Sequence, residues 1–300
     1  MKDTVLQLME GAYDVHMHAT PGLSRRRKTI LQIAYEAKEY GMKGIVYKDH
    51  HFSTAPQASI VNEVVPEVRI IGGVTLGGSV GGLNPAVVES TFKLGGKVVW
   101  MFSLESAWMA KQMLSPEFGS VENYRKLGVK PELGGYSVFR PGTEELADEA
   151  REIIALCKQY DGVMETSHLS VKEGAAMIRE GKKQGLKRMV ITHANKDGFV
   201  YPVELQKILT VELGAASMYC MTSHMSKPGE AGKPVKELSN LIRQIGPENV
   251  VLGTDFGLPY WPSAVEGMRM MISCLLEEGF TEKEIATMVK TNPDRLYWPD

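Results

Sequence analysis

The amino-acid sequence predicts an α/β fold and, within that class, a (β/α)₈ (TIM) barrel. Eight short apolar runs alternate with helical patterns over nearly all of the 300 residues. Several of these runs are rich in β-branched residues and bounded by glycine or charged turns, as buried parallel strands tend to be. The first run ends in histidines, at the place where a doubly wound open sheet usually carries a glycine-rich turn. A closed barrel is therefore favoured, and the doubly wound sheet is the alternative.

The expected strands and helices follow one another in regular order. The strands span residues 12–18, 44–48, 69–74, 97–102, 162–168, 188–193, 215–221 and 249–255. Apolar residues at helical spacing predict helices over residues 30–37, with a stop at Gly41, and 146–157. Further helix starts are marked by Asn84 before Pro85 and by capping boxes at Ser170 with Glu173 and Thr281 with Glu284.

One connection is longer than an ordinary βα loop. Residues 105–142, after the fourth expected strand, carry aromatic side chains and Arg140 among prolines and glycines. Long loops in compact domains tend to be lids or binding loops, and a packed surface excursion is the alternative. The chain contains no repeat, low-complexity tract or linker. We therefore expect a single domain, residues 1–300, with this insertion.

Composition excludes several classes of protein. A net charge of −2 gives no sign of a nucleic-acid partner. No apolar run approaches the roughly 20 residues that span a bilayer, and the N-terminus does not resemble a signal peptide. The three cysteines are widely spaced and never form a C-x-x-C pair, which argues against a disulfide framework or a thiolate zinc site. We expect a cytoplasmic protein with no membrane or nucleic-acid partner, and a homo-oligomer is compatible with the sequence.

A histidine pair ends the first expected strand. Because side chains alternate along a strand, His16 and His18 are expected on one side, roughly 6.5 Å apart along it. Val15 and Met17 are then expected to pack against the helices. The active sites of barrels form at the carboxyl ends of the strands, which is where this pair lies. Alone the pair is a weak signal, because two histidines can also be satisfied polar groups.

The stronger signal is that the pattern recurs. His168, His193 and Asp255 close the fifth, sixth and eighth expected strands. Four of the seven histidines thus occupy strand ends, whereas simple core packing would scatter them. Imidazole and carboxylate ligands suit zinc, and also manganese, iron or nickel. We predict one or two divalent metal ions, zinc first, held by His16, His18, His168, His193 and Asp255.

These motifs resemble the amidohydrolase superfamily of metal-dependent hydrolases. The resemblance lies in Asp14-x-His16-x-His18, Thr166-Ser-His168, Ile191-Thr-His193, Gly253-Thr-Asp255 and the ending Asn292-Pro-Asp-Arg-Leu296. More narrowly, Gly81-Gly-Leu-Asn-Pro85, Val99-Trp-Met101 and Ala264-Val-Glu-Gly267 resemble a poorly characterised amidohydrolase-like subgroup, a domain of unknown function. The resemblance covers nearly the whole chain. It implies that the five predicted ligands bind metal and that Asp255 takes the proton of the attacking water.

The sequence departs from the superfamily in one place. Members with two metals bridge them with a carboxylated lysine or a glutamate at the end of the fourth strand. The fourth expected strand ends at Ser103, and Glu105, the nearest carboxylate, lies two residues into the loop. The number of metal ions therefore stays open.

The second expected strand ends in a polar cluster, Lys48-Asp-His-His51. It resembles the Asp-His motif of polymerase-and-histidinol-phosphatase (PHP)-type phosphoesterases, but these usually end in a late Asp-x-His, which this chain lacks after Asp255. We expect Lys48 and His50 to polarise a substrate oxygen and His51 to contact substrate. A charged surface turn is the alternative.

Three more residues are expected near substrate. The basic run Arg25-Arg-Arg-Lys28, Arg25 first, would bind a carboxylate or phosphate, and a solvated charge run is the alternative. Arg140 would contact substrate from the long connection, and Trp261 would wall the pocket or simply pack. The expected reaction is attack of a metal-activated water on the carbonyl of a cyclic amide, lactone, amide or ester, with Asp255, Lys48 and His50 as catalytic residues. A small-molecule substrate is expected, and an anionic one would suit the basic run. The alternatives are a PHP-like phosphoesterase, a metal-assisted decarboxylase and a non-catalytic metal- or ligand-binding barrel.

Overall fold

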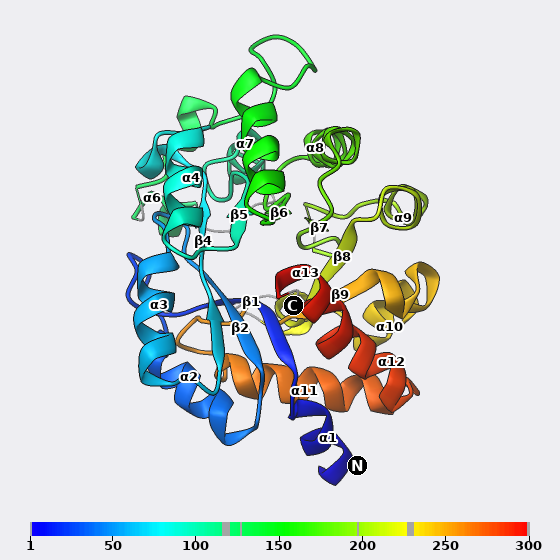
Figure 1. Ribbon diagram of the computed structural model, residues 1–300. Helices are drawn as coiled ribbons and strands as arrows, with labels where there is room; N and C mark the ends of the chain where they lie inside the picture. The colour runs from blue at the N-terminus through cyan, green and yellow to red at the C-terminus, as the bar shows by residue number, and fades with distance from the viewer. Residues whose placement is uncertain (1, 116–120, 127, 197, 227–230, 299–300) are drawn as a thin grey trace.

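Parallel strands lie at the centre of the molecule and helices surround them (Figure 1). A computed structural model describes residues 2–115, 121–126, 128–196, 198–226 and 231–298. One sheet contains β1 (Tyr13–His18), β2 (Gly44–Lys48) and β3 (Arg69–Ile71). The other contains β4 (Gly73–Thr75), β5 (Val98–Trp100), β6 (Val163–Glu165), β7 (Met189–Ile191), β8 (Ala216–Cys220) and β9 (Val250–Gly253). Neighbouring described strands follow chain order, without the reversal that marks a doubly wound sheet.

The expected third strand, residues 69–74, is divided rather than continuous. Its first part, β3, pairs with β2, and its second part, β4, pairs with β5. The break falls at Gly72, where a Cβ atom would lie 2.7 Å from the Ala55 Cα. At the next residue, Gly73, a Cβ would lie 2.1 Å from the Val98 carbonyl oxygen. Two glycines are needed because other backbone approaches closely where the chain passes from one sheet to the other.

The helix boundaries follow the local signals in the sequence. Gly41, with a φ of 66°, follows α2 (Ile30–Glu39), and the Asn84 side chain caps α4 (Pro85–Lys93). Both predicted capping boxes are present, at the starts of α8 (Val171–Gln184) and α12 (Glu282–Ala286). The other helices are α1 (Lys2–Met9), α3 (Ala55–Val64), α5 (Ala107–Met113), α6 (Glu122–Arg125), α7 (Asp148–Gln159), α9 (Val203–Lys207), α10 (Val235–Ile245), α11 (Ala264–Glu277) and α13 (Asn292–Tyr297).

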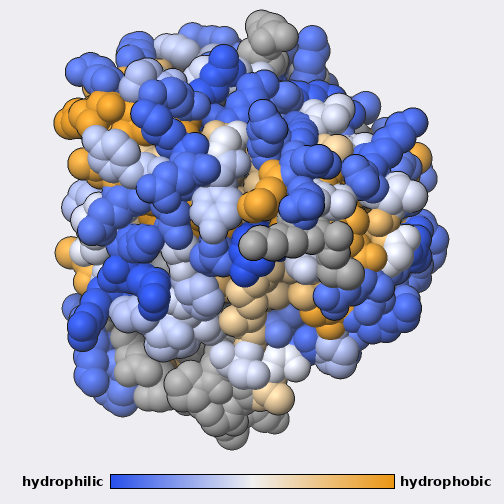
Figure 2. Space-filling model, turned by 90° about the horizontal axis from the view of Figure 1, so that it is seen from below, coloured by the Kyte–Doolittle hydropathy of each residue, from blue (hydrophilic) through white to orange (hydrophobic). Residues whose placement is uncertain are grey.

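Two apolar clusters hold these elements together. The larger fills the space between the strands and the surrounding helices. The smaller draws residues from strands of both sheets together with Leu296 and Tyr297 of α13. The face in Figure 2 is mainly hydrophilic, with hydrophobic residues in small separate groups. Among the described helices, none has both the length and the apolar character required to cross a bilayer.

A bulge in β1 changes which of its side chains lie in each of the two apolar clusters. Between Asp14 and Met17 the chain advances three residues, while the paired β2 advances two, from Ile45 to Tyr47. The expectation that Val15 packs with Met17 against the helices is therefore wrong. Val15 lies in the smaller cluster, and Met17 alone joins the larger one. Such bulges re-aim side chains and are common next to active sites.

The first and last strands are joined at the level of the histidine pair. The Asp255 amide donates to the His16 carbonyl at 2.7 Å, and the His18 amide donates to the Phe256 carbonyl at 2.8 Å. The buried Asp14 carboxylate accepts from the Thr254 amide at 3.0 Å and the Thr254 hydroxyl at 2.6 Å. Burial raises the pKa of Asp14 to about 7, although the Thr254 donors act in the opposite direction.

The long connection, residues 105–142, has its own small apolar cluster. Its described part contains α5, α6 and a short 3₁₀ turn, Pro131–Leu133, while residues 116–120 and 127 lie outside the described residues. The cluster consists of Leu104, Met109, Met113, Val129 and, from the loop after β7, Phe199. Part of the connection therefore packs against the loop after β7, whereas Val138, near its end, is buried in the larger cluster.

Thr254→Val should lower the free energy of unfolding by about 1.5–3 kcal/mol, because a buried carboxylate loses one of its donors. Denaturant unfolding at pH 8, where Asp14 is mostly ionised, measures this. Thr143→Val is the matched control. It removes an exposed hydroxyl that donates to the Arg140 carbonyl, and water replaces this donor. Equal losses in the two variants would contradict the role given to the Asp14–Thr254 contact.

Candidate metal centre

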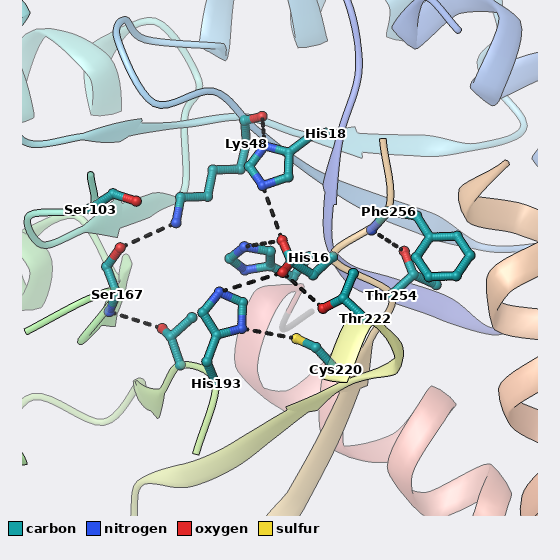
Figure 3. Close-up of polar contacts among 12 residues, drawn as sticks. His16, His18, Lys48, Ser103, Ser167, His193, Cys220, Thr222, Thr254 and Phe256 are labelled. Atoms are coloured by element: carbon teal, nitrogen blue, oxygen red, sulfur yellow. Dashed lines mark hydrogen bonds and ion pairs between the residues drawn. The ribbon is translucent and has the colours of Figure 1, made fainter. Parts of the chain in front are cut away.

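Three potential metal ligands meet at the ends of three strands. His16 lies on β1, and His193 lies two residues after the last residue of β7 (Figure 3). Asp255 lies two residues after the last residue of β9. One ligand atom from each lies within 4.8 Å of the others. Asp255 oxygens lie 3.8 Å from His16 Nε2 and 3.9 Å from His193 Nε2. Donors on one tetrahedral zinc are about 3.4 Å apart, so small side-chain shifts would bring these three onto one ion.

The ring nitrogens of His16 are buried polar atoms without hydrogen-bond partners. The side chain is fully buried. Its Nδ1 lies 3.7 Å from Glu165 Oε2, on the side of the ring away from Asp255. A buried polar group without a partner costs free energy. A metal at Nε2 would satisfy it, with Glu165 orienting the ring from behind.

The surroundings of His18 also fit a cation. Its Nδ1 lies 3.0 Å from the Lys48 carbonyl oxygen and its Nε2 lies 3.2 Å from Asp255 Oδ1. Burial, assisted by the nearby Arg26 charge, lowers the pKa of His18 to about 3, so the ring carries a single proton at neutral pH. Whichever nitrogen holds that proton, the other directs a lone pair at an acceptor. A metal ion at Nε2 removes this conflict.

His193 and Asp255 owe their positions to unusual backbone. His193 has a φ of 56° and Asp255 a φ of 54°, and Ser167, next to His168, has a φ of 50°. These left-handed conformations are uncommon outside glycine and cluster at functional sites. They end the strand alternation and direct the side chains across the strand ends. The second ring nitrogen of His193, Nδ1, lies 3.3 Å from Cys220 Sγ.

His168 and His50 lie beside this group and are joined through Ser103. The Ser103 hydroxyl lies 3.3 Å from His168 Nδ1 and 3.0 Å from His50 Nδ1. The centroid of the His168 ring lies 5.3 Å from the centroid of the His193 ring and 4.8 Å from that of the Phe199 ring. Ser103 thus stands where the sequence lacks a bridging carboxylate. His168 therefore lies next to the three closest potential ligands, His16, His193 and Asp255, rather than among them.

Lys48 enters the site from the end of β2. Its side chain is fully buried, and Nζ donates to the Ser167 hydroxyl at 3.2 Å (Figure 3). Burial lowers the pKa of Lys48 to about 8, while the Glu165 and Asp255 carboxylates act in the opposite direction. At neutral pH it is therefore mostly a cation with donors near the histidines.

Asp255 is the electrostatic centre of the cluster. Lys196 Nζ lies 3.3 Å from Oδ2, and the Thr222 hydroxyl donates to the same oxygen at 3.0 Å. Burial raises the pKa of Asp255, but the Lys196 ammonium and the neighbouring histidines outweigh it and hold the pKa well below its usual range. The carboxylate is thus ionised and suited to a metal ion or to a proton from water.

The other predicted residues lie further out. His51 Nδ1 is 3.4 Å from Asp49 at the rim, and Arg25 is exposed. Arg140 is an exposed partner of Asp148 and Glu145, away from the histidines. Trp261 is buried, stacks on Phe256 and donates to the Ser226 carbonyl. Glu105 accepts from the Gly78 amide instead of facing the cluster.

The sequence predictions do not include Ser103, Glu165 and Lys196, and they include Arg26 only as a member of the basic run 25–28. Glu165 carried a usable signal, because a carboxylate inside a buried strand requires partners. It has them, since the Tyr297 and Thr192 hydroxyls donate to it at 2.8 and 3.0 Å. In the sequence Lys196 cannot be distinguished from a surface lysine. Ser103 gives no signal either, because serine is not a usual metal ligand.

The fold and the site together define an α/β protein of parallel strands with a histidine–aspartate cluster at their carboxyl ends. The sequence model of the family of unknown function DUF6282 matches residues 11–217, so the chain belongs to that family. A search of the curated proteins gives no match.

Several solved structures share this fold. An amidohydrolase from Pseudomonas aeruginosa superposes with a TM-score of 0.64 at 13% identity, over 97% of each chain. An organophosphorus hydrolase from Deinococcus radiodurans gives 0.57 at 14% identity, over 98% of this chain and 93% of that one. A 2,6-dihydroxybenzoate decarboxylase gives 0.55 at 10% identity, over 96% of this chain and 99% of that one. The likeness is one of fold.

Zn²⁺ added to metal-free protein should raise the Tm by about 5 °C when it is present at 100 times its Kd, because only the folded state assembles the ligands. His193→Ala should abolish most of this rise. His224→Ala is the matched control, since that imidazole contacts Asn195 outside the cluster. The same rise in all three proteins would argue against the centre.

Glu165→Gln should weaken Zn²⁺ binding by about 10- to 100-fold, because it removes the charge behind the His16 ring while keeping the shape of the side chain. Competition with a chelating dye measures the affinity. Glu145→Gln, at an exposed partner of Arg140, should leave it unchanged. An unaltered affinity in Glu165→Gln would show that this carboxylate does not support the metal.

Proposed function

We propose that this protein is a metal-dependent hydrolase of the amidohydrolase superfamily that acts on a lactone, cyclic amide, amide or ester. The observation that carries this proposal is the convergence of His16, His193 and Asp255, within 4.8 Å, at the carboxyl ends of parallel strands. Enzymes that share the fold include an amidohydrolase and an organophosphorus hydrolase. Fold alone does not choose a substrate, so the choice of a carbonyl substrate rests on the chemistry of the cluster.

The proposal includes a closed (β/α)₈ barrel formed by one domain, with the described part of residues 105–142 as a lid over the site. Closure is supported by the two backbone hydrogen bonds that link His16 and His18 to the segment after β9. It is also supported by the smaller apolar cluster, which combines residues from both sheets.

His16, His18, His193 and Asp255 would hold the metal, with His168 completing the site for a second ion. Zinc suits this set of imidazoles and a carboxylate best. When bound, the metal would lower the pKa of a water molecule and polarise the substrate carbonyl.

The protein's own groups would move the proton and stabilise the charge. Asp255, ionised and buried, would accept a proton from the attacking water and pass it to the leaving group. The Lys48 ammonium would donate to the developing oxyanion, with His50 beside it. Ser103 and Ser167, which contact these two side chains, would hold them in place.

Phosphate-ester hydrolysis is the second candidate. It is favoured by the cationic Lys48 and Lys196 near the cluster, and an organophosphorus hydrolase shares the fold. Hydrolysis of p-nitrophenyl phosphate, with no turnover of lactones, esters or amides, would select it.

Asp255→Asn, assayed on a panel of lactones, esters and amides, should lower kcat of the metal-loaded enzyme by about 100-fold or more, because the general base is lost. Asp161→Asn is the matched control, since this aspartate shares the left-handed backbone (φ 51°) but pairs with Arg188 far from the cluster. Metal content is measured in both. Full turnover in metal-loaded Asp255→Asn would contradict the mechanism.

A further inference from the structure

The basic run after β1 contains one side chain whose role the metal centre leaves unexplained. Arg25 is exposed, Arg27 donates to the Pro259 carbonyl at 3.1 Å, and Lys28 pairs with Glu36 at 2.8 Å. Arg26 is half-buried, and its Nε is fully buried without a hydrogen-bond partner. Within the described part of the chain, no ion pair or hydrogen bond joins Arg26 to a carboxylate.

The loop that carries Arg26 is held over the site. The Thr20 amide donates to the Lys28 carbonyl at 3.1 Å, and the Arg27 amide donates to Gly257, two residues after Asp255, at 2.8 Å. At the other end of the loop, a Cβ on Gly22 would lie 2.5 Å from Asp49 Oδ2. The loop therefore spans from the end of β2 to the end of β9. It brings the Arg26 charge close to Asp49, Asp255 and His18.

Each carboxylate around the site already has a partner other than Arg26 on at least one oxygen. Asp255 is engaged by Lys196, and its remaining oxygen faces His18. Asp49 accepts from the His51 amide at 2.8 Å, and Glu165 accepts from two hydroxyls. Arg26 thus keeps unused donors at the mouth of the site.

A half-buried guanidinium with free donors is costly unless a ligand satisfies it. Its planar fork matches a carboxylate or phosphate, with two parallel hydrogen bonds. We propose that Arg26 binds an oxyanion group, carboxylate or phosphate, on the substrate of the enzyme. The substrate is then a carbonyl compound with an anionic group remote from the bond that is cleaved. This inference rests on the proposed hydrolase function for its second test but not for its first.

The first test is binding, measured by titration calorimetry on the full chain with benzoate, phenyl phosphate and neutral benzyl alcohol. Wild type should bind one or both anions and not the alcohol, and the anion that binds identifies the oxyanion. Arg26→Gln should weaken this binding by about tenfold or more, as the loss of a charged hydrogen bond implies. Arg25→Gln is the matched control, one residue away and exposed, and should change it less than twofold.

Arg26→Lys separates loss of binding from loss of folding, because it keeps the positive charge but removes the planar guanidinium and its pair of parallel donors. It should fold as wild type and bind the anion with an affinity between those of wild type and Arg26→Gln. Anion binding unchanged in Arg26→Gln, equal losses in Arg25→Gln and Arg26→Gln, or equal binding of alcohol and anions would each overturn the assignment.

The second test is kinetic and compares 4-acetoxybenzoate with phenyl acetate. Arg26→Gln should raise KM for the anionic ester by about tenfold or more and leave KM for the neutral ester unchanged. An equal rise for both esters would overturn the assignment. If neither ester nor any other carbonyl compound is hydrolysed, the proposed function fails while the binding result still decides the role of Arg26.

Discussion

The tie between the first and last strands is the constraint on which the rest of the site depends. Asp14 and Thr254 are 240 residues apart, yet the buried Asp14 carboxylate accepts from both the amide and the hydroxyl of Thr254. Beside this contact the Asp255 amide bonds to the His16 carbonyl. Together they fix the aspartate opposite the histidine pair. The bulge in β1 then turns His16 toward Asp255, so the geometry of the cluster follows from the way the strands meet.

The contact between the first and last strands also brings buried polar groups together in an arrangement that a cation would stabilise. Neutral imidazoles and an ionised carboxylate meet in a buried space, where facing lone pairs and orphaned nitrogens are costly. The Lys196 ammonium relieves part of this by pairing with Asp255. It does not reach the two unpartnered nitrogens of His16, nor does it resolve the two acceptors that face His18. A metal ion at Nε2 of both histidines would leave the proton of each ring on Nδ1, directed at Glu165 in His16 and at the Lys48 carbonyl in His18. The cluster is therefore better explained as a metal centre than as a packed polar core.

Much of the fold and part of the site could be predicted from the sequence, for identifiable reasons. Strand order, helix caps and residues at strand ends depend on local patterns, so the meeting of His16, His193 and Asp255 could be anticipated. The bulge at Val15 and the left-handed backbone at the strand ends could not, because they depend on partner strands and leave no glycine as a mark. Arg26 could not be separated from its basic neighbours for the same reason. Their roles are set by loop contacts rather than by residue type.

The most direct test of the central claim is elemental analysis of the purified protein combined with an anomalous-scattering crystal structure. A metal-edge peak should lie between His16 Nε2, His193 Nε2 and the Asp255 carboxylate, with His18 Nε2 directed at it. Protein expressed with ample metal that carries none, and that keeps the Lys196–Asp255 ion pair in its place, would contradict the assignment of a metal centre.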